Sequence, residues 1–382
     1  MAKKKLIVVW PYRFRDFDWQ RFELEQLSKH VEVHVHELID ALTPEFAAAY
    51  ANQSERPEVK RFSSLKDWRY EFKKISEDSI IFTHIRPTNP KSTIVCITLA
   101  TSKMRVVSFL LGGPVLPVRE VSGVLQKLES LFKKAYHYLR RNLLTSVMPD
   151  FLAIAGSESE RLGKRDFSRG TKLIAMHSFD FESFLGLKEH PELKNVSVFL
   201  DTGFPGFIRD EALTGRRESV SENQWYPRLN TFFTAVEKYL GASVEIAMHP
   251  KHIGRDHSRF FGNRLTVGGK TIEMVSSSLV VIATNSTAIS YAVCFDKPLL
   301  LVTCDAIEKS GQRKRIQIAN SAQETGARIF NIDREYTERE LREALLIDHA
   351  KRESYKQKYL TSRMDDKPNY QVLLDEVINV VD

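Results

Sequence analysis

Short apolar runs alternate with amphipathic stretches along most of this chain. Several runs, such as LIVVW (6–10) and PLLLVTCD (298–305), are almost continuously apolar. Runs of this kind are typical of central strands in a parallel sheet, because helices cover both faces of such a sheet. We expect strands at 6–10, 31–38, 78–85, 93–99, 106–113, 172–178, 195–203, 244–249, 264–269, 278–284 and 298–305, and one more at the start of 150–162.

Apolar residues at helical spacing lie between many of these runs. In the segment 125–144, Leu125, Leu128, Leu131 and Phe132 recur three or four residues apart, which predicts an amphipathic helix. Further helices are expected at 15–30, 225–241, 269–278, 286–295, 336–346, 351–360 and 370–381.

The alternation of strands and helices occurs twice, with an interruption at HPELKN (190–195). A repeated pattern of this kind predicts two doubly wound α/β domains, each built on a mostly parallel sheet. We expect an N-terminal domain over 1–188, a second domain over 189–350, and C-terminal helices over 351–382 that pack back toward the first domain.

Two strands of the second half end in polar residues that suit phosphate binding. In open α/β sheets, ligands lie beyond the carboxyl ends of the strands. An imidazole and a lysine at one strand end, with hydroxyls before a helix at another, could bind an anion. The alternatives are a hydrogen-bonded core histidine and an ordinary helix cap. The candidate phosphate ligands are His249, Pro250, Lys251, Asn285, Ser286 and Thr287.

The order of motifs in this half is strand-HP, G-x-T-x-E helix, strand-x-S-T-A, helix and KP. This order resembles the C-terminal domain of GT-B glycosyltransferases that build bacterial surface polysaccharides, over roughly 195–380. It is most similar to the sialyltransferase-like and Kdo-transferase-like groups, in which the HP and S/T motifs hold the nucleotide phosphate. CDP-glycerol phosphotransferases of teichoic acid synthesis have a similar order.

The resemblance implies a GT-B fold, with two Rossmann-like domains and a cleft between them, and a transferase that needs no metal or other cofactor. It implies transfer of Kdo or a sialic-acid-like sugar from a CMP-activated donor. The acceptor would be a lipid-linked or oligosaccharide precursor of lipopolysaccharide, O-antigen or capsule. One alternative is a CDP-glycerol or polyol phosphotransferase, in which His249 would be the base. Another is a non-catalytic nucleotide- or glycan-binding protein.

Two carboxylates are candidates for the chemistry of glycosyl transfer. Asp201 ends a strand in VFLDTGFPG, and Glu158 lies at a strand-to-helix turn in AGSESER. An inverting enzyme would use one of them as a general base, and a retaining one would use a nucleophile and an acid/base pair. By the resemblance to retaining Kdo transferases, we expect Asp201 to be the nucleophile and Glu158 the acid/base. The alternatives are a turn-forming aspartate and a first-turn helix acid.

Further polar side chains could contact the donor. Glu273 lies on the helix between the two phosphate-binding motifs and could hold ribose hydroxyls, or it could belong to a solvated helix face. Arg86, Arg161 and Arg209 could neutralise the carboxylate of an ulosonic acid, although exposed arginines are common.

Composition limits the class of protein more than its function. The chain has 382 residues, of which 42% are hydrophobic, and a net charge of +7. It can therefore bury substantial cores, and its charge is compatible with nucleic acid, an anionic membrane or a phosphorylated ligand. No recognition-helix motif stands out, so we expect no nucleic acid partner. Cys96, Cys294 and Cys304 are expected to be reduced thiols of a cytosolic protein.

Two segments raise the possibilities of metal and membrane binding. In HVEVHVHE (30–37), alternation places Glu32, His34 and His36 on one strand face, which could hold a metal or be the polar face of an edge strand. The predicted helix at 125–144 has a basic face that could lie on the anionic inner membrane, or it could pack on its own domain. No apolar run is long enough to span a bilayer.

Overall fold

The computed structural model describes residues 3–47, 54–87, 89–112, 149–167, 170–187, 191–205, 220–249, 258–309 and 313–380. They form two compact units. Unit 1 holds the described residues up to Leu111, those from 149 to Phe179, and those from Thr361 onward, and unit 2 holds Gly112 and the described residues of Asp180–Leu360. The chain thus enters unit 2 within α9 (Phe179–Leu185), earlier than the expected boundary after residue 188, and the expected segment 351–382 is shared between the units.

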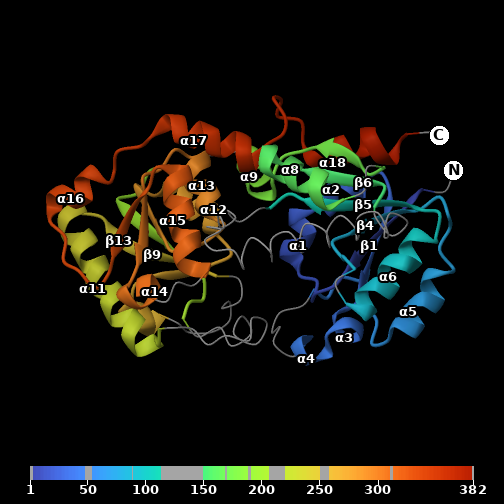
Figure 1. Cartoon of the computed structure of the whole chain (residues 1–382), viewed down its shortest axis with the longest axis horizontal. Coiled ribbons are helices and arrows are strands. Elements are labelled where there is room, and N and C mark those ends of the chain that lie inside the picture. The colour runs from blue at the N-terminus through green and yellow to red at the C-terminus, as the bar shows by residue number, and fades with distance from the viewer. Residues whose placement is uncertain are drawn as a thin grey trace, which may run out of the picture. The chain divides into compact units, whose positions relative to one another are not determined.

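Unit 1 is built on a seven-stranded parallel sheet in the order β3-β2-β1-β4-β5-β6-β7. Figure 1 labels β1, β4, β5 and β6 of this sheet. The first six strands of this order follow the Rossmann pattern, in which the strand order reverses between β1 and β4. The strands are β1 (Lys5–Trp10), β2 (Glu32–Glu37), β3 (Val59–Arg61), β4 (Ile80–Thr83), β5 (Arg105–Leu110), β6 (Phe151–Ile154) and β7 (Lys172–Ala175).

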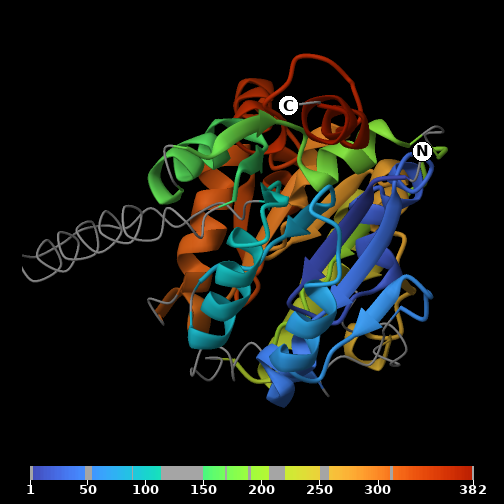
Figure 2. The same ribbon diagram turned by 90° about the vertical axis from the view of Figure 1, so that its right-hand side faces the viewer.

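Both faces of this sheet are covered. Leu6 and Val8 of β1 point into one core, which includes residues of the C-terminal segment such as Val372, while Ile7 and Val9 point into the opposite core. This explains why β1 is continuously apolar. Figure 2 shows unit 1 with the C-terminal helix α18 packed onto it. The described residues of unit 1 form the helices α1 (Asp16–Arg21), α2 (Leu24–Leu27), α3 (Ile39–Leu42), α4 (Pro44–Ala47), α5 (Leu65–Phe72), α6 (Pro90–Ala100), α8 (Gly156–Asp166) and α18 (Asn369–Leu373), which continues into a π-helix at Leu374–Ile378.

Three sequence expectations in unit 1 are wrong. The apolar run at 93–99 belongs to helix α6, because Pro90 follows the capping residue Asn89 and only one face of the segment is buried. The expected helix at 15–30 breaks at Glu23, whose φ is 51°. Strand β2 is not an edge strand, since it lies between β1 and β3.

Unit 2 is built on a six-stranded parallel sheet in the order β10-β9-β8-β11-β12-β13, again the Rossmann pattern. Its reversal point lies between β8 and β11. The strands are β8 (Val196–Leu200), β9 (Ser243–Met248), β10 (Thr266–Gly268), β11 (Val280–Ala283), β12 (Leu299–Thr303) and β13 (Arg328–Asn331).

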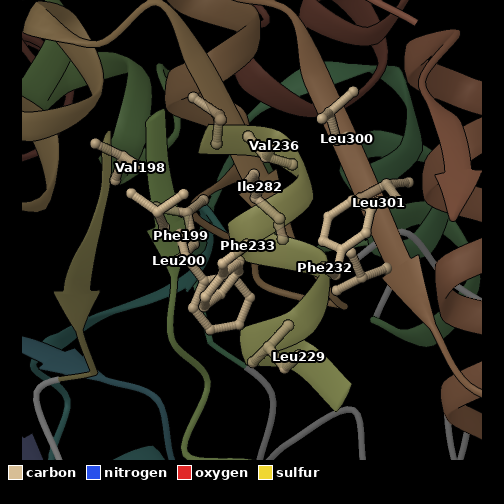
Figure 3. Close-up of a cluster of buried hydrophobic side chains, with 14 of the residues drawn as sticks. Val198, Phe199, Leu200, Leu229, Phe232, Phe233, Val236, Ile282, Leu300 and Leu301 are labelled. Carbon is tan, nitrogen blue, oxygen red and sulfur yellow. The ribbon is translucent and has the colours of Figure 1, made fainter. Parts of the chain in front are cut away.

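The long helix α11 (Glu222–Leu240) forms the centre of the core of unit 2. Leu229, Phe232, Phe233 and Val236 lie on one side of this helix, against side chains of the central strands (Figure 3). The described part of unit 2 also contains α12 (Thr271–Ser277), α13 (Ile289–Cys294), α14 (Asp305–Lys309), α15 (Arg313–Thr325), α16 (Glu338–Glu343) and α17 (His349–Tyr355), with a 3₁₀ turn at Ser258–Phe261 and a π-helix at Lys356–Leu360.

Candidate functional site

The carboxyl ends of β9, β8 and β11 meet at one edge of the sheet of unit 2. Leu200, near the end of β8, pairs with Ala247 of β9 on one side and with Ala283 of β11 on the other. The residues that follow these strands therefore lie in one row. Since neighbouring strands are about 5 Å apart, the ends of β9 and β11 are about 10 Å apart. The register thus brings the two predicted motifs, around His249 and Ser286, to the same edge.

Asp201 connects the ends of β8 and β9. Its side chain is only 5% exposed. One carboxylate oxygen accepts a hydrogen bond from the backbone N–H of Gly203 at 2.8 Å, and the other accepts from the backbone N–H of His249 at 3.2 Å. Each oxygen of this buried carboxylate thus accepts a hydrogen bond from a backbone N–H group. The bond from His249 fixes the backbone of this half-buried residue, which directly follows β9.

A turn rich in hydroxyl groups follows β11. The hydroxyl of Thr284 lies 3.4 Å from that of Thr202, and the hydroxyl of Ser286 accepts from the backbone N–H of Ala288 at 3.2 Å. Helix α13 begins at Ile289, so the predicted helix at 286–295 starts three residues later than expected and the Ser286 motif lies in the turn. In this position the hydroxyls of Ser286 and of the exposed Thr287 can donate to a ligand.

Helix α15 places positive charge beside this row. Its residue Gln317 accepts from the side-chain amide of Asn285 at 3.1 Å, which fixes the first turn of α15 near the end of β11. The ammonium group of Lys314, in that turn, lies 3.1 Å from the ring centroid of Phe204, which follows β8. Phe204 in turn packs edge-on against Trp225 of α11. Lys314 is not among the residues expected from sequence, although the three consecutive basic residues at 313–315 were a visible signal.

A cavity of about 490 Å³ opens further along the edge, at the ends of β12 and β13. This volume is within the range of small-molecule sites. Asp333 forms an ion pair with Arg228 at 2.6 Å and accepts from the backbone N–H of Asp305. A hydrogen bond from Asn331, and then one from Lys309, lower the pKa of Asp305. The lining includes Arg228, Thr231, Asp305, Ala306, Lys309 and Asp333.

The other predicted site residues are distributed over both units. Glu273 is exposed on α12 of unit 2. Glu158 lies in the first turn of α8 in unit 1, where its two oxygens accept from the guanidinium of Arg161 at 2.9 and 2.5 Å, so two residues expected to have separate roles bind each other. Arg86, also in unit 1, lies over the ring of Phe167. Pro250, Lys251 and Arg209, and the predicted basic helix at 125–144, lie outside the described residues.

The side chains of Glu32, His34 and His36, which we considered as metal ligands, do not share one environment. His34 contacts the carboxylate of Glu32 at 2.7 Å on the surface, whereas His36 is buried and accepts from the indole N–H of Trp68 at 3.3 Å. Within the described ranges, no group of three or more metal-binding side chains is found. The helices of the same ranges include none that is long and apolar enough to cross a membrane.

Comparison with known proteins identifies the fold. A scan against protein-family models finds no match, and a search of curated proteins finds no significant one. Among solved structures, a histidine variant of the wall teichoic acid polymerase TagF soaked with CDPG covers 98% of this chain and 88% of its own, at 12% identity and a TM-score of 0.56. A second TagF structure covers 93% and 84% at a TM-score of 0.52 and 12% identity. The spinosyn forosaminyltransferase SpnP covers 100% of both chains at 11% identity and a TM-score of 0.47.

The likeness to the two TagF structures shows the fold and confirms the predicted fold class. The chain has the GT-B architecture, in which one polypeptide forms two Rossmann-like α/β units with seven and six parallel strands.

Proposed function

We propose that this chain is a transferase that moves a polyol phosphate, with glycerol phosphate as the simplest case, from a CDP-activated donor to a hydroxyl group of a bacterial surface polymer. The observation that carries the proposal is the position of His249. Asp201 holds the backbone of His249 at the edge of the sheet, in the same row as the hydroxyl-bearing turn after β11. A GT-B transferase can bind its nucleotide at this edge, because ligands of doubly wound sheets lie beyond the carboxyl ends of the strands.

The proposed reaction breaks and forms bonds at phosphorus. The acceptor hydroxyl attacks the phosphorus that carries the polyol, the bond from this phosphorus to the CMP oxygen breaks, and CMP leaves with the electron pair. The imidazole of His249 takes the proton of the attacking hydroxyl as a general base. The hydroxyls of Ser286 and Thr287 and the ammonium of Lys314 are the groups that would stabilise charge on the phosphate oxygens. The cavity at β12 and β13 would receive the nucleoside.

The environment of Asp201 favours this reaction over glycosyl transfer by double displacement. In double displacement a carboxylate attacks the anomeric carbon. Asp201 is almost fully buried, and both of its oxygens accept from backbone N–H groups. These contacts suit a residue that positions His249. The likeness to TagF supports the same substrate class, since TagF is a wall teichoic acid polymerase with a CDPG-soaked structure.

A second candidate is transfer of Kdo or a sialic-acid-like sugar from a CMP-activated donor to lipopolysaccharide, O-antigen or capsule. The order of the HP and S/T motifs in the sequence favours it. In this case the same row would bind the single phosphate of the donor, and Glu158 would remain the candidate acid/base of unit 1. Arg86, Arg161 and Arg209 would remain the candidates that bind the sugar carboxylate.

The two candidates are separated by offering the full chain CDP-glycerol and CMP-Kdo, each with an acceptor mixture, and measuring release of CMP. We expect CMP from CDP-glycerol, and a rate about 10²–10⁴-fold lower in His249→Asn, as for loss of a general base. His349→Gln is the matched control, because His349 is an exposed histidine of the same unit, and should keep the rate. Release from CMP-Kdo alone would select the second candidate. Release from neither donor, with no binding of CMP or CDP by calorimetry, would refute both.

A further inference from the structure

The corresponding edge of unit 1 carries a different chemistry. The strand order of unit 1 reverses between β1 and β4, and this is where doubly wound sheets bind ligands. Trp10 ends β1, and His84 directly follows β4. Their rings are 6.0 Å apart, so the two strand ends meet at one place on the edge.

Aromatic side chains surround this point. Trp10 contacts Tyr12 at 6.0 Å and Phe22 at 5.2 Å between ring centroids. Tyr12 and Phe17 are 40% and 46% exposed, although most large apolar side chains of unit 1 are buried. The segment after β1 therefore carries two partly exposed aromatic side chains beside the reversal point.

Two arginines bring positive charge close to His84, namely Arg21 and Arg86, which follows His84 by two residues. Arg21 lies over the rings of Phe179 at 4.3 Å and Phe17 at 5.8 Å, and no carboxylate within ion-pair distance of it is found among the described residues. Part of the His84 side chain is exposed, and the rest is surrounded by protein atoms. The loss of hydration caused by these atoms, and then the charges of Arg86 and Arg21, lower the pKa of His84 to about 4. Both guanidinium groups thus act on the side chain that follows β4.

Neighbouring arginines differ from Arg21 in their contacts. Arg13 is bound to the carboxylates of Glu37 and Asp40, and Arg15 to that of Asp18. Their charges are therefore compensated within the fold, and they hold the segment after β1 in place. The guanidinium of Arg21 packs on aromatic rings instead, and a guanidinium stacked in this way can still bind a ligand through its N–H groups.

We propose that this edge binds the acceptor substrate through a phosphate group, with Tyr12 and Phe17 packing on the polyol or sugar carbons and Arg21 and Arg86 binding the phosphate. Planar guanidinium groups bind phosphate through paired hydrogen bonds. The acceptor is then a phosphodiester-linked polyol polymer. The inference rests on the proposed function, because it assigns the acceptor of the same transfer.

The test compares binding and turnover of defined acceptors by the full chain. The probes are a synthetic glycerol-phosphate oligomer, free glycerol 3-phosphate and the neutral oligosaccharide maltohexaose. We expect the oligomer to bind most tightly by calorimetry. Loss of a charge-assisted hydrogen bond in Arg21→Gln should weaken oligomer binding and raise its KM about 10-fold or more, and Tyr12→Ala should act in the same direction.

Matched controls come from helix α5 of the same unit. Arg69 is exposed there, and Tyr70 is 66% exposed, with the ammonium of Lys74 over its ring. Arg69→Gln and Tyr70→Ala should therefore leave oligomer binding unchanged. Affinity for CDP should be unchanged in all four variants, and Arg21→Lys should restore part of the oligomer affinity.

The inference is overturned if Arg21→Gln and Tyr12→Ala bind the oligomer as the native chain does, or if maltohexaose binds as well as the oligomer. If free glycerol 3-phosphate bound as tightly as the oligomer, the edge would be a site for a soluble phosphate ester, and the proposal of a polymeric acceptor would be overturned. Failure of the proposed function has a separate signature, absence of CMP release from CDP-glycerol by the native chain. Even without CMP release, calorimetry can still test the inference, because binding of the oligomer does not require a donor.

Discussion

Replacing Asp201 by asparagine tests whether this carboxylate positions His249 or attacks substrate. The amide oxygen of asparagine can accept only one of the two backbone N–H groups that Asp201 now binds. The amide nitrogen then faces the other N–H, so one buried donor loses its acceptor. Such a loss costs about 1–3 kcal/mol. For a domain of this size, we expect Tm to fall by about 4–8 °C, based on a cost near 2 kcal/mol.

Thermal unfolding followed by circular dichroism measures the effect, with Glu308→Gln, an exposed acid of the same unit, as control. A positioning role also predicts that Asp201→Asn retains part of the transfer rate and that its effect is not additive with that of His249→Asn. An unchanged Tm together with complete loss of turnover would refute this reasoning. It would return Asp201 to the role of nucleophile.

Three further perturbations test the fold. Burial, and then the charges of His34 and Lys60, lower the pKa of His36 from 6.5 to about 4. As pH falls, His36 is therefore protonated at a higher pH in the unfolded state than in the folded state. The free energy of unfolding should decrease by up to about 3 kcal/mol between pH 6.5 and 4, and the decrease should be smaller in His36→Gln. Urea titration at each pH measures both. Phe233→Ala should destabilise unit 2 by about 3–5 kcal/mol in the same assay, because Phe233 is fully buried at its centre (Figure 3). Gly326→Ala should lower the free energy of unfolding by about 1–2 kcal/mol or more, because φ is +75° and the new Cβ would lie 2.8 Å from the Cβ of Asp348. The midpoint of urea unfolding measures this change, and an unchanged midpoint would contradict the backbone geometry.

The sequence predicted the strands of the two sheets better than the helices. Fully apolar runs identify central strands such as β1, β8 and β12 because both faces of a parallel sheet are buried. The same signal failed at 93–99, since a helix with β-branched residues on both faces also gives a continuous apolar run, and only the cap at Asn89 and Pro90 distinguishes it. Helix α15 was missed because its sequence is largely polar, and its contacts with β12 and β13 depend on the tertiary fold.

The candidate site was predictable where it depends on topology. A strand end is visible in sequence, and the parallel order brings His249 and Ser286 to one edge without any knowledge of side-chain contacts. The partners of the carboxylates were harder to predict. The pairing of Glu158 with Arg161 follows from their spacing of three residues on a helix. The bond that Asp201 accepts from the backbone N–H of Gly203 is local and matches the turn-forming alternative given for this residue. The bond from the backbone N–H of His249 does not follow from any sequence pattern, because it joins the ends of two separate strands.

The two units carry different side chains at the same edge of a similar strand order. In unit 2 a buried carboxylate, Asp201, fixes the backbone of His249 at the strand end. In unit 1 the fully buried Glu37 accepts from Arg13 at 2.6 Å and from the backbone N–H of Phe14 at 2.7 Å, and so fixes the segment that carries Tyr12. In each unit, therefore, a buried acid holds backbone at the edge of the sheet, and the neighbouring side chains determine what that edge can bind. Hydroxyls and an imidazole suit an activated phosphate, whereas exposed rings and a guanidinium suit a polyol that carries one.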